Sequence, residues 1–423
     1  MTTTAGPEPR PLAVVGCRSA ADVAGAIDLA RRHGVPAVPR SGGHCFAGRS
    51  WTSGVVIDVR PMRTVTAAGD RVTVGAGVRL GELYAELARH GMTLPAGCGP
   101  TVGIAGLTLG GGFGILGRRY GLTADRLTAA RVVLADGRVV DCDEERHADL
   151  FWALRGAGGG QFGVVTELTF RAVPEPEVTA FHLAWPVAEA AAVLAAWQEW
   201  SPDGPDELAA SLLLVGGPDP GRPPVANVFG TLLGGEPETA ALLARFIARV
   251  GTPPATQAVA TRPYAATKQH LAELGARMAG PATEHRPLSR SEYVARSLPE
   301  EAVAALVDGL ARDRVAGETR ELDVSPWGGA YTRVPVDATA FAHREARFLV
   351  KHAVTGPDPA GWLDRSWAAA HPWGTGGVYP NFPDPRLDDP LGAYHGPNLA
   401  RLRQVKAAYD PGGFFDFPQS IRA

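Results

Sequence analysis

The chain has 423 residues, of which 45% are hydrophobic and 20% charged, and its mean hydropathy of −0.03 is near zero. This composition predicts a soluble globular protein and excludes a disordered or membrane-embedded chain. The formal net charge is −3 and no block of basic residues occurs, so we expect no nucleic acid partner. The length exceeds that of a usual single hydrophobic core and favours two domains.

The cysteines and the N-terminus bear on metal binding and location. Cys17, Cys45, Cys98 and Cys142 lie far apart, in no disulfide or metal-ligand spacing, so we expect neither a disulfide framework nor a metal site. The first residues contain no basic or apolar segment of the kind that directs secretion, and no apolar run has membrane-spanning length. These features predict a cytoplasmic protein without a membrane partner.

The chain begins with a mixed α+β pattern. A helix is predicted from Ser19 to about Arg32, closed by Gly34, and an amphipathic helix is predicted over residues 81–90. Strands with alternating or fully apolar side chains are predicted over residues 12–15, 35–38, 54–59 and 71–77.

A glycine-flanked loop, Arg40 to Gly48, follows the second of these strands. Glycine pairs are ordinary turn residues, but Gly42 and Gly43 also let backbone N–H groups approach an anion such as a diphosphate closely. A phosphate loop alone needs no imidazole. His44, directly after the pair, therefore indicates a more specialised cofactor site.

A second glycine-rich segment spans residues 94–114. We predict a ligand-wrapping loop and no helix here, because each glycine costs about 1 kcal/mol relative to alanine inside a helix. Interleaved apolar residues such as Val102, Leu107 and Phe113 distinguish the segment from a flexible linker.

The next part of the chain alternates short elements with a third glycine cluster. Asp136-Gly137 closes a predicted hairpin over residues 130–140. A short helix over residues 149–155 ends in the glycine cluster at 156–163, and a strand over 164–170 follows.

The pattern of residues changes at about Pro174, after which the dense glycine clusters no longer occur. A linker is predicted over 174–177, and a strand over 323–331 combines aromatic and polar residues that can face a substrate. Longer helices over 188–200, 236–250 and 300–312 alternate with strands such as 209–215 and 225–233. This pattern indicates a second domain that forms the wall of a pocket.

Four stretches in this order resemble the berberine-bridge-enzyme-like branch of the vanillyl-alcohol oxidase superfamily of FAD-linked oxidoreductases, and the resemblance covers nearly the whole chain. They are residues 40–44, residues 100–106 with 110–112, residues 149–156 leading to 162–166, and the C-terminal residues 398–421. One glycine motif would be weak evidence, but four in this order are specific.

The resemblance implies an α+β fold in which a two-subdomain FAD-binding domain of the p-cresol methylhydroxylase type adjoins an α+β substrate domain, whose antiparallel sheet is covered by helices. It divides the chain into residues 1–175, the N-terminal part of the FAD-binding domain, residues 176–378, the substrate domain, and residues 379–423, which return to the FAD-binding domain.

The resemblance also implies that FAD lies between the two subdomains and that His44 bonds covalently to its 8α-methyl group. A neutral imidazole is a competent nucleophile near neutral pH. The residues implied in cofactor binding are Arg40, Ser41, Gly42, Gly43, His44, Cys98, Gly99, Thr101, Val102, Gly103, Ala105, Gly106, Leu107, Gly110, Gly111, Gly114, Gly163, Val164, Val165, Tyr394 and Asn398.

Three departures from the family pattern matter. Many relatives attach FAD a second time through a cysteine at the position of Gly99, whereas Cys98 lies one residue early. In an extended backbone such a shift points the side chain to the opposite face, so we predict a single link through His44.

Leu107 stands where relatives often carry a flavin-side histidine, so any charge that stabilises reduced flavin must come from elsewhere. Phe382 stands where several relatives use a tyrosine as base.

The implied reaction is that of an oxidase acting on a small alcohol, a sugar, or a polycyclic or phenolic natural product. A base removes a proton from substrate O–H or N–H, hydride passes to flavin N5, and O2 is reduced to H2O2. Tyr379 is the first candidate base and Tyr331 and His343 are further ones; a tyrosine, with a pKa near 10, needs nearby positive charge or hydrogen bonds for this role.

Val102 resembles the position where a valine is associated in the family with oxygen access to the flavin, which favours an oxidase. Two alternatives remain at this stage. They are a dehydrogenase with another electron acceptor, and a redox-neutral cyclase or scaffold that retains FAD.

Overall fold

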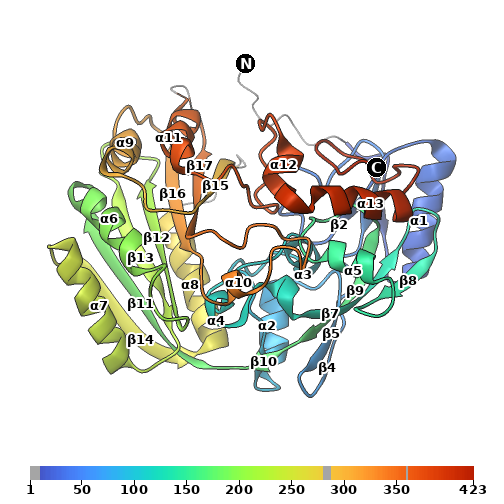
Figure 1. Cartoon of the computed structure of the whole chain (residues 1–423), viewed down its shortest axis with the longest axis horizontal. Coiled ribbons are helices and arrows are strands. Elements are labelled where there is room, and N and C mark those ends of the chain that lie inside the picture. The colour runs from blue at the N-terminus through green and yellow to red at the C-terminus, as the bar shows by residue number, and fades with distance from the viewer. Residues whose placement is uncertain (1–9, 280–286, 359–360) are drawn as a thin grey trace.

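The computed structural model describes residues 10–279, 287–358 and 361–423 (Figure 1). Its first sheet is parallel, with β3 (Val55–Asp58) between β1 (Ala13–Gly16) and β2 (Ala37–Arg40). Helix α1 (Ala20–His33) makes the crossover between β1 and β2. The His44 loop therefore starts at the C-terminal end of a parallel strand, where α/β units present ligand-binding loops.

The ends of α1 are those that the sequence predicts. The Ser19 hydroxyl accepts a hydrogen bond from the Asp22 backbone N–H, the Asp22 carboxylate accepts one from the Ser19 N–H, and Gly34 ends the helix with a left-handed φ of 62°.

The second sheet is antiparallel and has the strand order β4-β5-β9-β7-β8. The predicted hairpin is confirmed, because β7 pairs with β8 across the Asp136-Gly137 turn and Gly137 has a φ of 85°. The strands are β4 (Val65–Ala68), β5 (Arg71–Gly75), β7 (Leu127–Val133), β8 (Val139–Cys142) and β9 (Val164–Arg171).

Shorter elements surround these two sheets. They are α2 (Leu80–Ala88), the two-stranded pair β6 (Met92–Thr93) and β10 (Val173–Pro174), α3 (Ile104–Leu109), α4 (Gly117–Tyr120), the 3-10 turn η1 (Thr123–Arg126) and α5 (Ala148–Leu154). The C-terminal α12 (Pro390–His395) and α13 (Leu399–Tyr409) return to this part of the molecule, where α13 packs against α5 (Figure 1).

A seven-stranded sheet, here called the large sheet, is antiparallel throughout, with the order β14-β11-β13-β12-β16-β17-β15. Its strands are β11 (Glu177–Pro186), β12 (Leu208–Gly216), β13 (Val225–Leu232), β14 (Thr256–Pro263), β15 (Leu288–Val294), β16 (Thr319–Pro326) and β17 (Phe348–Thr355).

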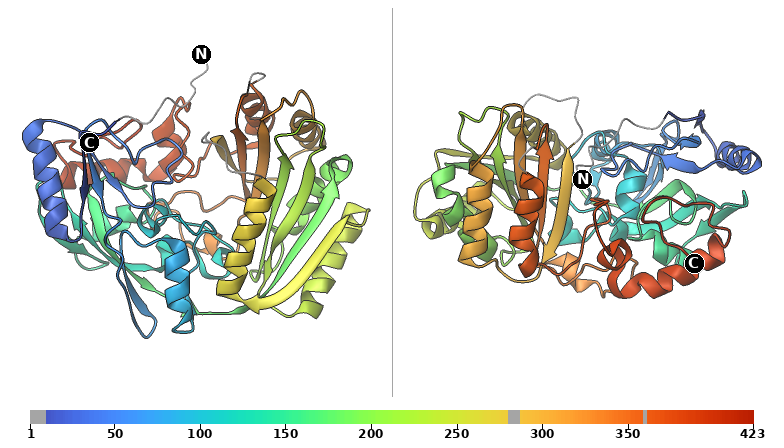
Figure 2. Two further views of the ribbon diagram at one scale, coloured as in Figure 1. Left: turned by 180° about the vertical axis from the view of Figure 1, so that it is seen from behind. Right: turned by 90° about the horizontal axis from the view of Figure 1, so that it is seen from above.

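Helices cover one face of the large sheet. The helices α6 (Ala190–Trp200), α7 (Glu236–Val250), α9 (Glu300–Ala311) and α11 (Trp362–Ala370) pack there over one hydrophobic core (Figure 1). Helix α8 (Tyr264–Ala279) contacts α2 and lies on the side that faces the other sheets (Figure 2). Because α8 packs against β11 and β14, only the rest of that face is available to a ligand between the two halves.

Three local predictions are wrong. The segment 94–114 contains the helix α3, because only Gly106 lies inside it while Gly103 and Gly110 flank it, and its buried side chains join the core. Strand β16 ends at Pro326, and the following glycines turn the chain into α10 (Ala330–Arg333). The expected linker over 174–177 is reduced to Glu175 and Pro176, because Pro174 ends β10, Glu177 begins β11, and both pair with neighbouring strands.

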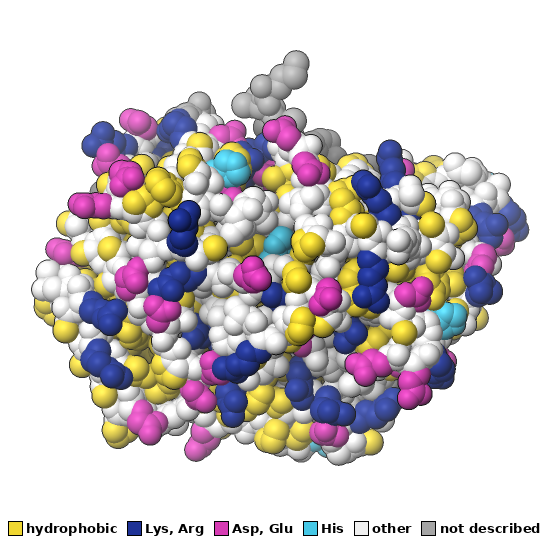
Figure 3. All heavy atoms as spheres, in the orientation of Figure 1, with side chains coloured by type: hydrophobic (Ala, Val, Ile, Leu, Met, Phe, Trp, Pro, Cys, Tyr) yellow, Lys and Arg dark blue, Asp and Glu magenta, His cyan; other side chains and the backbone are white. Residues whose placement is uncertain are grey.

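Two further findings concern the described residues only. None of their helices is long and apolar enough to cross a bilayer. No group of three or more His, Cys, Asp or Glu side chains is arranged there as a metal site. On the face drawn in Figure 3, acidic and basic side chains are interspersed.

Candidate functional site

A cavity of about 530 Å³ lies between the open face of the large sheet and the first half of the chain. Its wall combines the loop after β2, the segment around α3, the third glycine cluster, side chains of β12, β13 and β16, and the C-terminal segment. Ligand pockets usually have volumes of roughly 300 to 1,000 Å³, so this one can hold a sizeable small molecule.

Two of the glycine loops meet back to back at one wall of the cavity. A Cβ atom on Gly42 would overlap the backbone nitrogen of Gly103, and one on Gly103 would overlap the Ser41 hydroxyl. The Ser41 hydroxyl donates a hydrogen bond of 2.6 Å to the Ala76 carbonyl and fixes the loop after β2. The glycines are therefore required for contact between the loops, and backbone N–H groups are left near the cavity.

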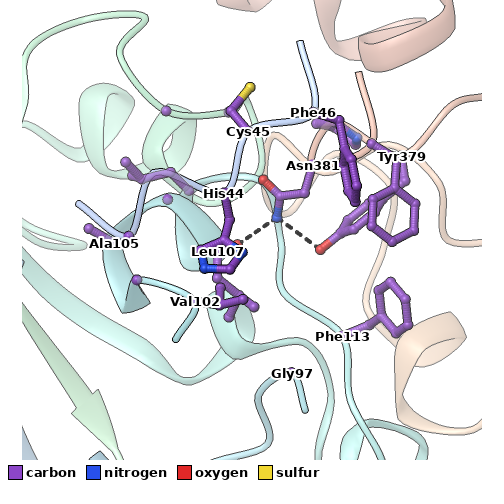
Figure 4. Close-up of a pocket in the computed structure, with 18 of the residues that line it drawn as sticks. His44, Cys45, Phe46, Gly97, Val102, Ala105, Leu107, Phe113, Tyr379 and Asn381 are labelled. Carbon is purple, nitrogen blue, oxygen red and sulfur yellow. Dashed lines mark hydrogen bonds between the residues drawn. The ribbon is translucent and has the colours of Figure 1, made fainter. Parts of the chain in front are cut away.

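His44 lies at this wall (Figure 4). Its Nε2 is 3.0 Å from the Thr101 hydroxyl. Partial burial and the Arg79 guanidinium lower the pKa of His44, and a hydrogen bond with the Thr101 backbone opposes them only in part. The imidazole is therefore neutral at pH 7, with Nε2 held by the Thr101 side chain.

The side chains of Asn381 and Tyr379 form a polar group among aromatic rings, on the other side of the cavity from His44 (Figure 4). The Asn381 amide donates to the Leu107 carbonyl and to the Tyr379 hydroxyl, both at 2.9 Å, and the Gly112 N–H donates to the same hydroxyl at 3.0 Å. Burial raises the pKa of Tyr379 to about 12 although these hydrogen bonds lower it. Tyr379 therefore keeps its proton at neutral pH. The surrounding rings are Phe46, Phe113 and Phe382.

The other two candidate bases differ in position. Tyr331 lines the cavity, but its hydroxyl accepts from the Gly114 N–H and donates to the Gly114 carbonyl, and burial raises its pKa. His343 does not line the cavity: its ring stacks on Tyr293, its Nε2 lies 3.0 Å from the Tyr394 carbonyl, and burial lowers its pKa to about 4. The structure gives His343 no contact with a cavity ligand.

The large sheet contributes a polar strip to the cavity. Ser211, Asp323 and Ser325 line it together with Phe229. The Asp323 carboxylate is 3.3 Å from the Lys351 ammonium. Burial lowers the pKa of Lys351, but the nearby carboxylates of Asp323 and Glu321 outweigh it and the pKa is raised. Lys351 is thus a fixed positive charge beside Asp323, with its Nζ 5.3 Å from the centre of the Phe382 ring.

Most of the cofactor residues implied by the resemblance line the cavity. The exceptions are Arg40, Thr101, Gly110, Gly111, Val164 and Asn398. Asn398 instead donates hydrogen bonds to the carbonyls of Val336, Thr339 and Ala340, so its amide links the C-terminal segment to the chain before β17. Thr101 acts on the cavity indirectly, through His44.

Several residues that line the cavity were not predicted from the sequence. Gly158–Gln161 belong to the third glycine cluster, which the sequence had marked without assigning its residues. Isolated side chains carried no local signal. Arg49 follows the His44 loop, whereas Phe417 and His395 reach the wall only through the folded C-terminal segment.

The backbone at Cys98 is bent and not extended, so the alternation argument for its side chain was wrong. Cys98 lines the cavity, and its sulfur is 3.3 Å from the ammonium of Lys268 on α8. The same ammonium donates to the carbonyls of Ala96 and Gly97, at 3.1 and 2.6 Å.

Two protein families match the parts of the chain that contribute the glycine loops and the C-terminal segment to the cavity. Residues 11–143 match the family described as FAD binding domain, and residues 378–422 match the family described as berberine and berberine like. The uncharacterized FAD-linked oxidoreductase YvdP of Bacillus subtilis is 33% identical over an alignment of 425 positions that covers 97% of this chain and 92% of YvdP.

Two further relatives match at similar length. A chitooligosaccharide oxidase of Gibberella zeae is 31% identical over 97% of this chain and 87% of its own length. The solved structure of Physcomitrella patens BBE-like 1 has a TM-score of 0.85 at 29% identity, over 96% of this chain and 90% of that one. These similarities extend across both halves of the molecule.

Proposed function

The chain belongs to the berberine-bridge-enzyme-like family of FAD-linked oxidoreductases, and on this premise we propose that it is an oxidase with FAD held covalently by His44. Its proposed substrate is a small alcohol, a sugar, or a polycyclic or phenolic natural product. When bound, FAD supplies the hydride acceptor, at N5, and the electrons that reduce O2 to H2O2.

The residues of the cavity fit this cofactor. The paired glycine loops bring backbone N–H groups to the wall, as a diphosphate requires. The observation that carries the proposal is the state of His44, which is neutral, lines the cavity and has its Nε2 engaged by Thr101. Nδ1 is therefore the nitrogen available for the covalent bond. A solved glucooligosaccharide oxidase, 26% identical to this chain, is described with a 6-S-cysteinyl, 8α-N1-histidyl FAD, and its histidyl link supports this choice.

The proton chemistry is assigned to two side chains. Tyr379 keeps its proton and its hydroxyl oxygen already accepts two hydrogen bonds, so it serves as a donor that orients a substrate oxygen. Asp323 is a carboxylate in the cavity wall, and we assign it the role of general base. The Lys351 ammonium, 3.3 Å away, holds the Asp323 carboxylate in place. Asp323 would thus take the role of the tyrosine that several relatives use as base at the position of Phe382.

The polar strip of the large sheet bears on the substrate class. Serine hydroxyls and a charged pair beside aromatic rings suit a ring that carries several hydroxyl groups, because rings stack on its apolar faces while hydroxyls find partners. A sugar fits this description, and the chitooligosaccharide oxidase among the relatives supports it.

Mass spectrometry of the acid-denatured protein tests the covalent link. We expect the wild-type chain to retain the mass of FAD on the peptide that contains His44, and His44→Ala to lose it, because no other nitrogen in that loop is a nucleophile. Cys98→Ser is the control and should retain the FAD. Retention of FAD mass by His44→Ala would contradict the proposal, and slow reoxidation of the reduced enzyme in air would indicate a dehydrogenase instead.

Replacing Thr101 by valine tests how His44 is held. The change keeps the shape of the side chain and removes its hydrogen bond to Nε2, so the appearance of covalent FAD should slow by roughly 2- to 10-fold, the kinetic equivalent of one ordinary hydrogen bond. The measurement is the fraction of covalent flavin against time after FAD is added to apoprotein. Thr108→Val, which removes a hydroxyl bonded to the Ile104 carbonyl, should leave this rate unchanged.

A further inference from the structure

Lys268, on helix α8, carries a buried amino group whose partners among the described residues include no carboxylate. Its side chain is 4% exposed. Its Nζ donates to the carbonyls of Ala96 and Gly97 and lies 3.3 Å from the Cys98 sulfur. Carbonyl oxygens solvate an ammonium group but do not balance its charge, so a buried ammonium at this point favours a negative group beside it.

Among the groups around this ammonium, the Cys98 thiol is the one that can become an anion. The rings of Tyr84 and Tyr264 have their centres 4.8 and 5.6 Å from Nζ. Burial raises the pKa of both tyrosines, so their hydroxyls keep their protons at neutral pH. Burial also lowers the pKa of Lys268, and the negative charge of the Cys98 sulfur opposes this effect. The charged forms of lysine and cysteine therefore stabilise each other.

The four cysteines differ in access and in their neighbours. Cys17 and Cys142 are buried, and burial raises their pKa to about 11 and about 12. Cys45 and Cys98 both line the cavity. In the part of the chain that the structure describes, Cys98 is the one cysteine that is exposed and has an ammonium in contact with its sulfur. Because the thiolate is the reactive form of cysteine, oxidation is expected at Cys98 first.

We propose that Cys98 is a site of reversible oxidation by hydrogen peroxide, and that Lys268 activates its sulfur. The thiol proton passes to the lysine amine, and the thiolate attacks one peroxide oxygen, so that an S–O bond forms and the O–O bond breaks. The second oxygen leaves as hydroxide and takes the proton back from the Lys268 ammonium. Sulfur is thus oxidised by two electrons to a sulfenic acid, which thiols can reduce, and peroxide is reduced to water.

The proposed oxidase reaction would release this peroxide in the same cavity. The inference rests on the proposed function only for that source, and the test therefore adds peroxide separately. Failure of a substrate to generate peroxide would contradict the proposed function and leave the result of the test unaffected.

The test treats the full-length protein, with its FAD, with H2O2 and traps sulfenic acid with dimedone, which does not label thiols. Peptide mass spectrometry then compares Cys98 with Cys45, the matched cysteine of the same cavity. We expect Cys98 to be labelled roughly 10-fold faster at pH 7, because an unassisted thiol is only a few per cent thiolate at that pH. Dithiothreitol added before dimedone should abolish the label.

Two substitutions of the lysine show whether the activation belongs to it. Lys268→Met removes the charge from an unbranched side chain and should slow the labelling of Cys98 roughly 10-fold, to the rate of Cys45. Lys268→Arg keeps a cation and should restore most of the rate. Unchanged labelling of Cys45 and an unchanged melting temperature show that the fold is retained.

Three results would overturn the proposal. They are equal labelling of Cys98 and Cys45 in the wild type, wild-type labelling of Cys98 in Lys268→Met, and a Cys98 peptide that carries the mass of FAD and no dimedone.

Discussion

Replacing Asp323 by asparagine should lower kcat by about 10²- to 10⁴-fold, the usual contribution of a general base. Asparagine preserves the shape of the side chain but cannot take up the substrate proton, and it leaves the Lys351 ammonium without its partner in the cavity wall. The measurement is the rate of anaerobic flavin reduction by the best substrate from an oxygen-electrode screen of alcohols, sugars and phenolic metabolites. FAD content should remain that of the wild type.

Two variants show whether the effect belongs to Asp323. Glu321→Gln, two residues earlier on the same strand, removes a carboxylate that does not line the cavity, so its kcat should stay within a few-fold of the wild-type value. Tyr379→Phe should raise KM more than it lowers kcat, since its hydroxyl is assigned to orient the substrate. If Asp323→Asn retained wild-type kcat and Tyr379→Phe lost it, the assignment of the base would be wrong.

Local signals in the sequence predicted much of the fold. Ser19 with Asp22 and Gly34 predicted both ends of α1, and Asp136-Gly137 predicted the β7–β8 turn, because each motif satisfies backbone groups within a few residues. The family, the α+β fold and FAD-linked oxidoreductase activity, all expected from the resemblance, are confirmed. The error at α3 arose because glycine content was counted over the whole segment, while the helix needed only a short run between Gly103 and Gly110.

In the candidate site too, residues with a local sequence motif could be predicted and residues placed only by tertiary structure could not. Glycine clusters identify loops that approach a ligand, since only glycine permits the close contact between Gly42 and Gly103. The sequence predicted that polar residues of the strand beginning at Asp323 can face a substrate, and Asp323 and Ser325 do line the cavity. It did not predict Ser211, which comes from the neighbouring strand β12. Phe417 and His395 had no signal at all, because only the folded C-terminal segment brings them to the cavity wall.

Replacing Asp125 by alanine should destabilise the protein by about 3 to 5 kcal/mol, the cost of leaving a buried charge unpaired. The Arg344 guanidinium is bidentate on the Asp125 carboxylate, at 2.9 and 2.7 Å, and its side chain is only 2% exposed. Asp125 also accepts a 2.9 Å hydrogen bond from the Leu122 N–H. The free energy of unfolding in urea measures the change, provided that the transition is two-state.

This ion pair connects the two halves of the molecule. Asp125 lies in η1, beside the second glycine segment, and Arg344 lies in the chain that leads to β17 and also bonds to the Tyr331 carbonyl. The matched control is Asp141→Ala, which breaks a half-exposed pair with Arg131 and should cost no more than about 1 kcal/mol. If Asp125→Ala lowered the free energy of unfolding by as little as Asp141→Ala does, Arg344 would have found another partner or water. A large loss in Asp125→Ala alone, accompanied by weaker FAD retention, would show that the same contact holds the large sheet against the cofactor site.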